Sequence, residues 1–80
     1  MHIRVIPKEH IPSLMEADKS HREALGRMLA VAGRFAAQQG SPNGFRTIID
    51  TGRVGGQEVY HLSAHILGGP DRLLRMLSRD

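Results

Sequence analysis

The sequence has no cysteine and no tryptophan, and its aromatic residues are one tyrosine and two phenylalanines. Without cysteine, disulfides and cysteine-based zinc sites are excluded, and a reducing compartment such as the cytoplasm is favoured. So few aromatic rings offer little stacking surface for single-stranded nucleic acid. No apolar run approaches the roughly 20 residues that a membrane helix needs, and the first residues do not resemble a signal peptide. We therefore expect a cytoplasmic protein with neither a membrane nor a nucleic-acid partner.

The chain is short, and its size limits how it can be stabilised. Its 80 residues allow one domain, and a chain of this length buries only about 60–65% of its unfolded surface. Because disulfides are excluded, self-association is the common remaining way to stabilise such a small core. The formal net charge of +3 suits an anionic ligand, although many of the charges are spread along a solvated helix face.

The hydrophobic pattern predicts an α+β fold in which an antiparallel sheet is packed by one long helix. Alternating, β-branched segments indicate strands, and apolar residues at spacings of three and four indicate an amphipathic helix. The expected elements are strands at 2–6, 45–50 and 58–67, a long helix at 19–39, and a short helix at 71–77. A glycine-rich loop is expected at 51–57, and residues 70–80 form a tail to a single domain that spans 1–80.

The predicted strand at 58–67 carries a row of chemically capable side chains. Because strand side chains alternate between two faces, one face holds His61, Ser63 and His65. The opposite face holds apolar residues, and the predicted core consists of Ile3, Val5, Phe45, Ile48, Tyr60, Leu62 and Ile66. Glycine pairs at 55–56 and 68–69 flank the row, which lets backbone approach a ligand closely.

This row resembles the signature of the histidine triad (HIT) family of nucleotide-binding proteins, which is His-φ-His-φ-His-φ-φ with φ apolar. Here the pattern reads His61-Leu62-Ser63-Ala64-His65-Ile66-Leu67. The segments 5–8, 10–11, 24–28, 44–46 and 55–60 also match in order and spacing, most closely to the bacterial Hint branch, so that the resemblance covers about residues 2 to 69. It implies the same fold and a homodimer. Members usually begin with a further helix and hairpin, and we expect this chain to lack that segment, which would leave a sheet edge uncovered.

The resemblance implies chemistry at the α-phosphate of a nucleotide. In the family the central histidine attacks that phosphate, and its imidazole is neutral and nucleophilic at physiological pH because its free pKa is about 6.5. Ser63 occupies this position here. A serine hydroxyl needs a general base, for which His61 or His65 are the neighbours on the same face. We therefore predict retained nucleotide binding and impaired catalysis.

The remaining site residues follow from the same resemblance. His65 is predicted to contact phosphate, and His61 either does the same or hydrogen-bonds backbone. The amides of the turn at Gly56 and Gln57 are predicted to face the anion. Asp50, where most members have asparagine, has no donor when ionised and would repel phosphate. His2 lies near the active centre, and it is the candidate third ligand for a metal, which we do not expect.

The predicted function is binding of a purine mononucleotide such as AMP or GMP, with ancestral hydrolysis of nucleotide phosphoramidates and no cofactor. Two alternatives remain open. One is a working hydrolase that uses Ser63 or His2 in a changed mechanism. The other is a non-catalytic, dimeric interaction module with no affinity for nucleotides.

Overall fold

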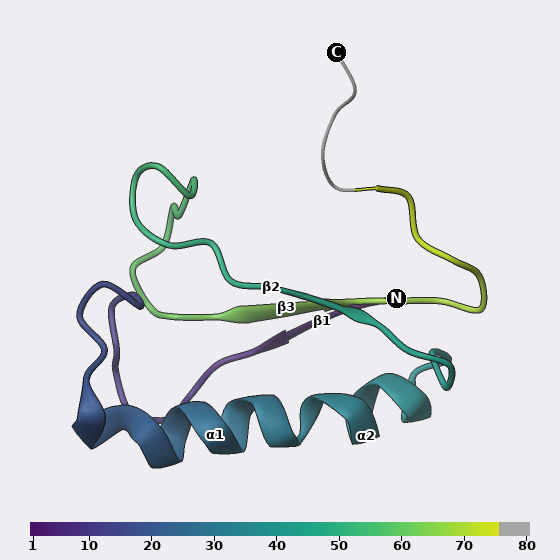
Figure 1. Ribbon diagram of the computed structural model, residues 1–80, viewed down its shortest axis with the longest axis horizontal. Coiled ribbons are helices and arrows are strands. Elements are labelled where there is room, and N and C mark those ends of the chain that lie inside the picture. The colour runs from purple at the N-terminus through teal and green to yellow at the C-terminus, as the bar shows by residue number, and fades with distance from the viewer. Residues whose placement is uncertain (76–80) are drawn as a thin grey trace.

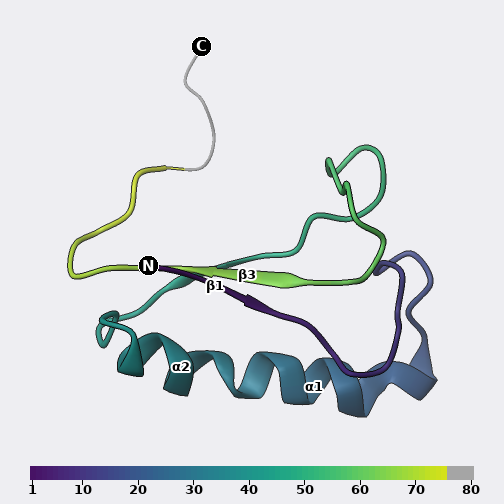
Figure 2. The same cartoon turned by 180° about the vertical axis from the view of Figure 1, so that it is seen from behind.

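A computed structural model describes residues 1–75 of the chain. It contains a three-stranded antiparallel sheet in the order β1-β3-β2. The strands are β1 (His2–Val5), β2 (Arg46–Ile48) and β3 (Ala64–Leu67). Helices pack along one face of this sheet, and within the described residues no helix covers the opposite face (Figure 1). The view from behind shows the same two layers (Figure 2). The predicted α+β fold is therefore confirmed, and the uncovered side is called the open face below.

The predicted helix at 19–39 is present as three consecutive elements: η1 (Lys19–His21), α1 (Arg22–Ala30) and α2 (Ala32–Gln38). The junction at Val31 does not break the rod, because Val31 N–H donates to the Arg27 carbonyl at 3.3 Å and Phe35 N–H donates to the Val31 carbonyl at 3.2 Å. Gly40 follows the helix with φ of +95°, a conformation that glycine adopts without steric cost. None of the helices in residues 1–75 is long and apolar enough to span a membrane.

Asp18 caps the start of this helical run. Its carboxylate accepts the Ser20 hydroxyl at 2.6 Å and the Ser20 N–H at 2.8 Å. These two hydrogen bonds favour the ionised form and lower the pKa of Asp18. His21 completes a capping box, because its Nδ1 accepts the Asp18 N–H at 3.0 Å.

The core lies between the sheet and the helices in two adjoining clusters. Leu62 and Ile66 are fully buried there, as predicted, and Ile3 and Val5 pack against the clusters as partly buried side chains. The other fully or nearly fully buried apolar residues are Ile11, Met28, Ala32, Ala36 and Ala64. The alanines are small enough to let the helix approach the sheet closely.

Three residues that the sequence pattern assigned to the core lie elsewhere. Tyr60 is 49% exposed and Phe45 is 41% exposed, because both precede the strands that they were expected to belong to. Ile48 is the register partner of His65, so its side chain lies on the open face. Ile49 packs against the core in its place.

The predicted strand at 58–67 is wrong over residues 58–63, since β3 covers only Ala64–Leu67. The two neighbouring strands are too short to pair with residues 58–63. β1 stops at Val5, ahead of a proline that has no N–H to donate, and β2 stops at Ile48. Residue 62 bonds instead to the connection after β1, with Leu62 N–H donating to the Ile11 carbonyl at 2.7 Å. The predicted helix at 71–77 is absent over 71–75, and its last two positions lie outside the described residues.

Candidate functional site

The register of the sheet assembles a polar patch on the open face. Arg4 and Ile48 are the partners of His65 on either side of β3. One row along the same face, His2 and Arg46 are the partners of Leu67. Directly opposite residues in an antiparallel pair point to the same side. Burial also alternates as predicted from 61 to 66, with His61, Ser63 and His65 half-buried and the residues between them buried.

His65 is held by His2. The His2 Nε2 and His65 Nδ1 atoms lie 2.9 Å apart, and the ring centroids are 5.1 Å apart. In such a pair one nitrogen donates and the other accepts. Residues 1–75 provide no hydrogen-bond partner for the other ring nitrogen of His65, Nε2. When His2 donates, that Nε2 carries the proton and is a donor for an anion.

Ser63 is not activated as a nucleophile. Its hydroxyl donates to the carbonyl of His61 at 2.9 Å, and within the described residues it makes no hydrogen bond to an imidazole. A hydroxyl that donates to a neutral carbonyl keeps its proton, whereas nucleophilic serine needs a base at that position. The predicted pairing of Ser63 with His61 or His65 is therefore not formed.

His61 serves the backbone, which was one of the two interpretations of its sequence position. Its Nε2 lies 3.2 Å from the Pro7 carbonyl, and since a carbonyl only accepts, Nε2 carries the proton. His10 packs edge-on against this ring with centroids 5.0 Å apart, and its own Nε2 lies 3.1 Å from the Tyr60 carbonyl. The sequence indicated no role for His10, because its neighbour in space is 51 residues away along the chain.

The glycine-rich loop is folded onto itself, contrary to one prediction. The amide N–H groups of Gly55, Gly56 and Gln57 donate to the carbonyls of Thr51, Arg53 and Gly52 at 3.1, 3.1 and 3.0 Å. The expectation that the amides of this turn face an anion is therefore wrong for this structure. The positive φ values of Gly52 (64°) and Gly56 (78°) turn the chain so that these bonds close within the loop.

The Gln57 side chain locks the loop in place. Its Oε1 accepts the Gly52 N–H at 2.9 Å, and its Nε2 donates to the Pro12 carbonyl at 2.7 Å and to the Val59 carbonyl at 3.1 Å. An amide with all these bonds made is fixed in orientation. Gln57 thus shapes the wall of the site through the loop that it holds.

The polar patch borders a cavity of about 230 Å³. Its lining comprises Arg4, Asp50, Gly56, Gln57, Glu58, Val59, His61, Ser63 and His65. Arg4 was not identified from the sequence, because only the register of β1 against β3 places it beside His65. The charges are mixed: the guanidinium of Arg4 attracts an anion, whereas the carboxylates of Asp50 and Glu58 oppose one. Within residues 1–75, no group of three or more acidic or histidine side chains is arranged to hold a metal.

Comparisons with known proteins point to one family. The HIT domain family matches residues 1–72. An uncharacterised HIT-like protein of Synechococcus elongatus is 51% identical over 69 residues, covering 86% of this chain and 60% of that protein. The purine nucleoside phosphoramidase of Escherichia coli K12 is 48% identical over 69 residues, covering 85% of this chain and 58% of the enzyme. The chain thus spans about three fifths of the length of these curated relatives.

Solved structures show the same fold. The crystal structure of a HIT family hydrolase from Legionella pneumophila superposes with a TM-score of 0.85 at 34% identity, covering 95% of this chain and 67% of that one. A HIT family hydrolase from Clostridium thermocellum gives a TM-score of 0.84 at 35% identity, covering 96% and 68% of the two chains.

Proposed function

Because the chain belongs to the HIT family, we propose that it binds a purine mononucleotide such as AMP or GMP on the open face of the sheet. The phosphate lies at His65, and Arg4 adds a positive charge. One observation supports this assignment above the others: His2 occupies Nδ1 of His65, while residues 1–75 leave Nε2 without a partner. That arrangement suits a hydrogen bond from the imidazole to a phosphate oxygen.

The size of the cavity limits how much of the ligand it encloses. At about 230 Å³ it is smaller than the roughly 300–1,000 Å³ of common small-molecule pockets. In our proposal it accommodates the phosphate, with Gly56 and Gln57 at the wall, while the ribose and base extend over the open face. Asp50 opposes the negative charge of the phosphate and weakens the site.

The chemistry that relatives perform is proposed to be impaired in this chain. A relative is named as a purine nucleoside phosphoramidase, and hydrolysis at the α-phosphate needs a nucleophile. The Ser63 hydroxyl donates to a carbonyl rather than to a base, which supports binding without efficient turnover. A hydrolase that used the Ser63 hydroxyl would require a base beside it, which the contacts of residues 1–75 do not provide.

An AMP titration followed by NMR of the imidazole signals tests the binding site. We expect saturable shifts at His65 and His2, with no shift at His21, which lies in η1 and serves as an internal reference. His65→Ala should weaken AMP binding about tenfold or more, since hydrogen bonds to charged groups contribute about 1.5–3 kcal/mol. Unmoved signals at millimolar AMP would reject nucleotide binding and favour the interaction module.

We also propose that the protein forms a homodimer in the cytoplasm. Leu29 and Phe35 are exposed apolar side chains on α1 and α2, and within residues 1–75 both β1 and β2 lie at an edge of the three-stranded sheet. Exposed apolar groups and open edges both favour self-association.

Light scattering at micromolar concentration should therefore give the mass of a dimer. Leu29→Glu should shift the population towards monomer, because a carboxylate would be buried at the contact. Val54→Glu is the matched control, since Val54 is 93% exposed in the loop and should leave the mass unchanged. A wild-type monomer at these concentrations would contradict the proposal.

A further inference from the structure

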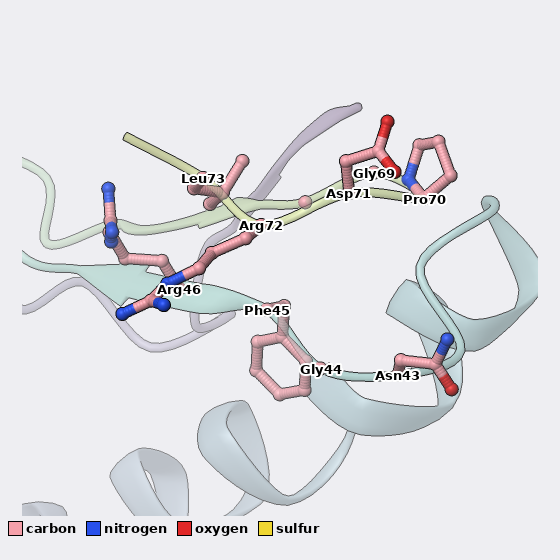
Figure 3. A pocket seen from close by; sticks show the side chains of 10 residues that line it. Asn43, Gly44, Phe45, Arg46, Gly69, Pro70, Asp71, Arg72 and Leu73 are labelled. Carbon is pink, nitrogen blue, oxygen red and sulfur yellow. The ribbon is translucent and has the colours of Figure 1, made fainter. Parts of the chain in front are cut away.

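A second hollow lies on the same molecule, at the opposite end of β3 from the histidine cavity. It measures about 430 Å³ and is lined by residues 43–46, which lead into β2, and by residues 68–73, which follow β3. Figure 3 shows these two segments facing each other across it. The function proposed above does not use this hollow.

Ser41 joins the two walls of the hollow. Its buried hydroxyl accepts the Gly69 N–H at 3.0 Å and donates to the Gly44 carbonyl. Gly68 packs against the same serine so closely that a Cβ atom at this position would overlap the Ser41 side chain. Both walls are thus fixed to each other by a buried polar contact, so the hollow is a built part of the fold.

Two arginines line this hollow. Arg46 extends from β2 and Arg72 from the segment after β3. In Figure 3 both guanidinium groups lie at the same end, while the Asp71 side chain lies at the other end beside Pro70. Within residues 1–75 neither arginine forms an ion pair, since the ion pairs there involve only His21 and Arg27. Two cations that line one hollow without an ion-pair partner in the described residues favour an oxyanion there, and the guanidinium fork matches phosphate geometry.

The position of Arg46 relates this hollow to the histidine site. Arg46 is the partner of Leu67, two residues from His65 on the same face. At about 3.4 Å per residue and about 4.8 Å between strands, the Cα atoms of Arg46 and His65 are roughly 8 Å apart. An anion at the arginines and a phosphate at His65 are therefore within reach of one extended ligand.

We propose that Arg46 and Arg72 form a second oxyanion site that takes a phosphate group. The proposal that the two arginines bind an anion depends only on the hollow that they line. The proposal that they share one ligand with His65 rests on the proposed nucleotide site. The phosphate comes either from the distal end of a nucleotide whose α-phosphate lies at His65, or from free inorganic phosphate.

The test is a titration with inorganic phosphate, followed by NMR of the arginine side-chain N–H signals. We expect saturable shifts at Arg46 and Arg72, in the wild type and equally in His65→Ala. Arg46→Gln and Arg72→Gln should each weaken phosphate binding about tenfold. Arg27→Gln is the matched control, because Arg27 pairs with Glu23 on α1 at 3.2 Å and should leave binding unchanged. Unmoved signals of Arg46 and Arg72, or an equal loss in the control, would overturn the proposal.

A comparison of AMP with ADP distinguishes the two sources of phosphate. If the site takes the distal phosphate of the nucleotide, Arg46→Gln weakens ADP binding and leaves AMP binding unchanged. If it takes free phosphate, AMP and ADP respond alike, while inorganic phosphate still shifts Arg46. If inorganic phosphate shifts the Arg46 signal but AMP does not shift the His65 signal, the arginine site is supported and the nucleotide site is rejected. The experiment therefore distinguishes failure of one site from failure of the other.

Discussion

Ser63→His is expected to raise the hydrolysis of a nucleotide phosphoramidate by about 10³-fold or more, given that loss of the nucleophile in a serine protease costs about 10⁶-fold. A backbone hydrogen-bond acceptor for the new side chain is already in place. The carbonyl of His61 already accepts a hydrogen bond from side chain 63 at 2.9 Å. An imidazole at this position can donate through one nitrogen to that carbonyl and present the other nitrogen to a phosphate. The measurement is the initial rate of amine release from an adenosine phosphoramidate.

Ser63→Ala is the matched control and should stay as inactive as the wild type. A wild-type rate that falls with Ser63→Ala would instead support the alternative mechanism through the serine hydroxyl. If Ser63→His folds and shows no increase, the double variant with Asp50→Asn tests whether the carboxylate at the cavity wall is the obstacle. An inactive double variant would show that these two substitutions do not account for the impairment.

Ile66→Ala is expected to reduce the free energy of unfolding by about 3–4 kcal/mol. Ile66 is 0% exposed and packs against Ala32 and Ala36 on α2. Because the two alanines are small and lie on a rigid helix, they cannot move inwards to fill the space. An 80-residue domain has a total stability of about 4–12 kcal/mol, so the variant should lose about a third or more of it. Urea denaturation followed by circular dichroism measures the change.

Two further substitutions serve as controls for the size of this loss in stability. Val54→Ala removes an apolar side chain that is 93% exposed and should change the free energy of unfolding by less than about 0.5 kcal/mol. Ile48→Ala acts on a half-buried side chain of the open face and should fall between the two. A loss at Ile48 equal to that at Ile66 would show that the open face is covered in solution, for example by a second copy.

The fold was predictable from the sequence because its signals are periodic. Leu62, Ala64 and Ile66 alternate with polar residues, and Met28, Ala32 and Ala36 recur at helical spacing. Strand lengths were not predictable in the same way. A strand continues only while a neighbour pairs with it, and the ends of β1 and β2 depend on where the chain turns away at Pro7 and after Ile48.

The candidate site was predictable in part for a similar reason. Alternation alone places His61, Ser63 and His65 on one face. The contributions of Arg4 and Arg46 depend on strand register, which no local pattern specifies. The direction of the loop amides depends on which glycines adopt positive φ, and several arrangements are open to a segment so rich in glycine.

The hydrogen bond between His2 and His65 joins positions 63 residues apart in the chain. The two histidines come together because β1 pairs with β3 in the folded sheet. The unfolded chain therefore lacks this phosphate site and does not compete with the folded chain for the ligand. Any ligand of His65 stabilises the folded state by its full mass-action contribution, about 2.7 kcal/mol at a concentration of 100 Kd. For so small a domain, that contribution is a large fraction of the total stability of about 4–12 kcal/mol.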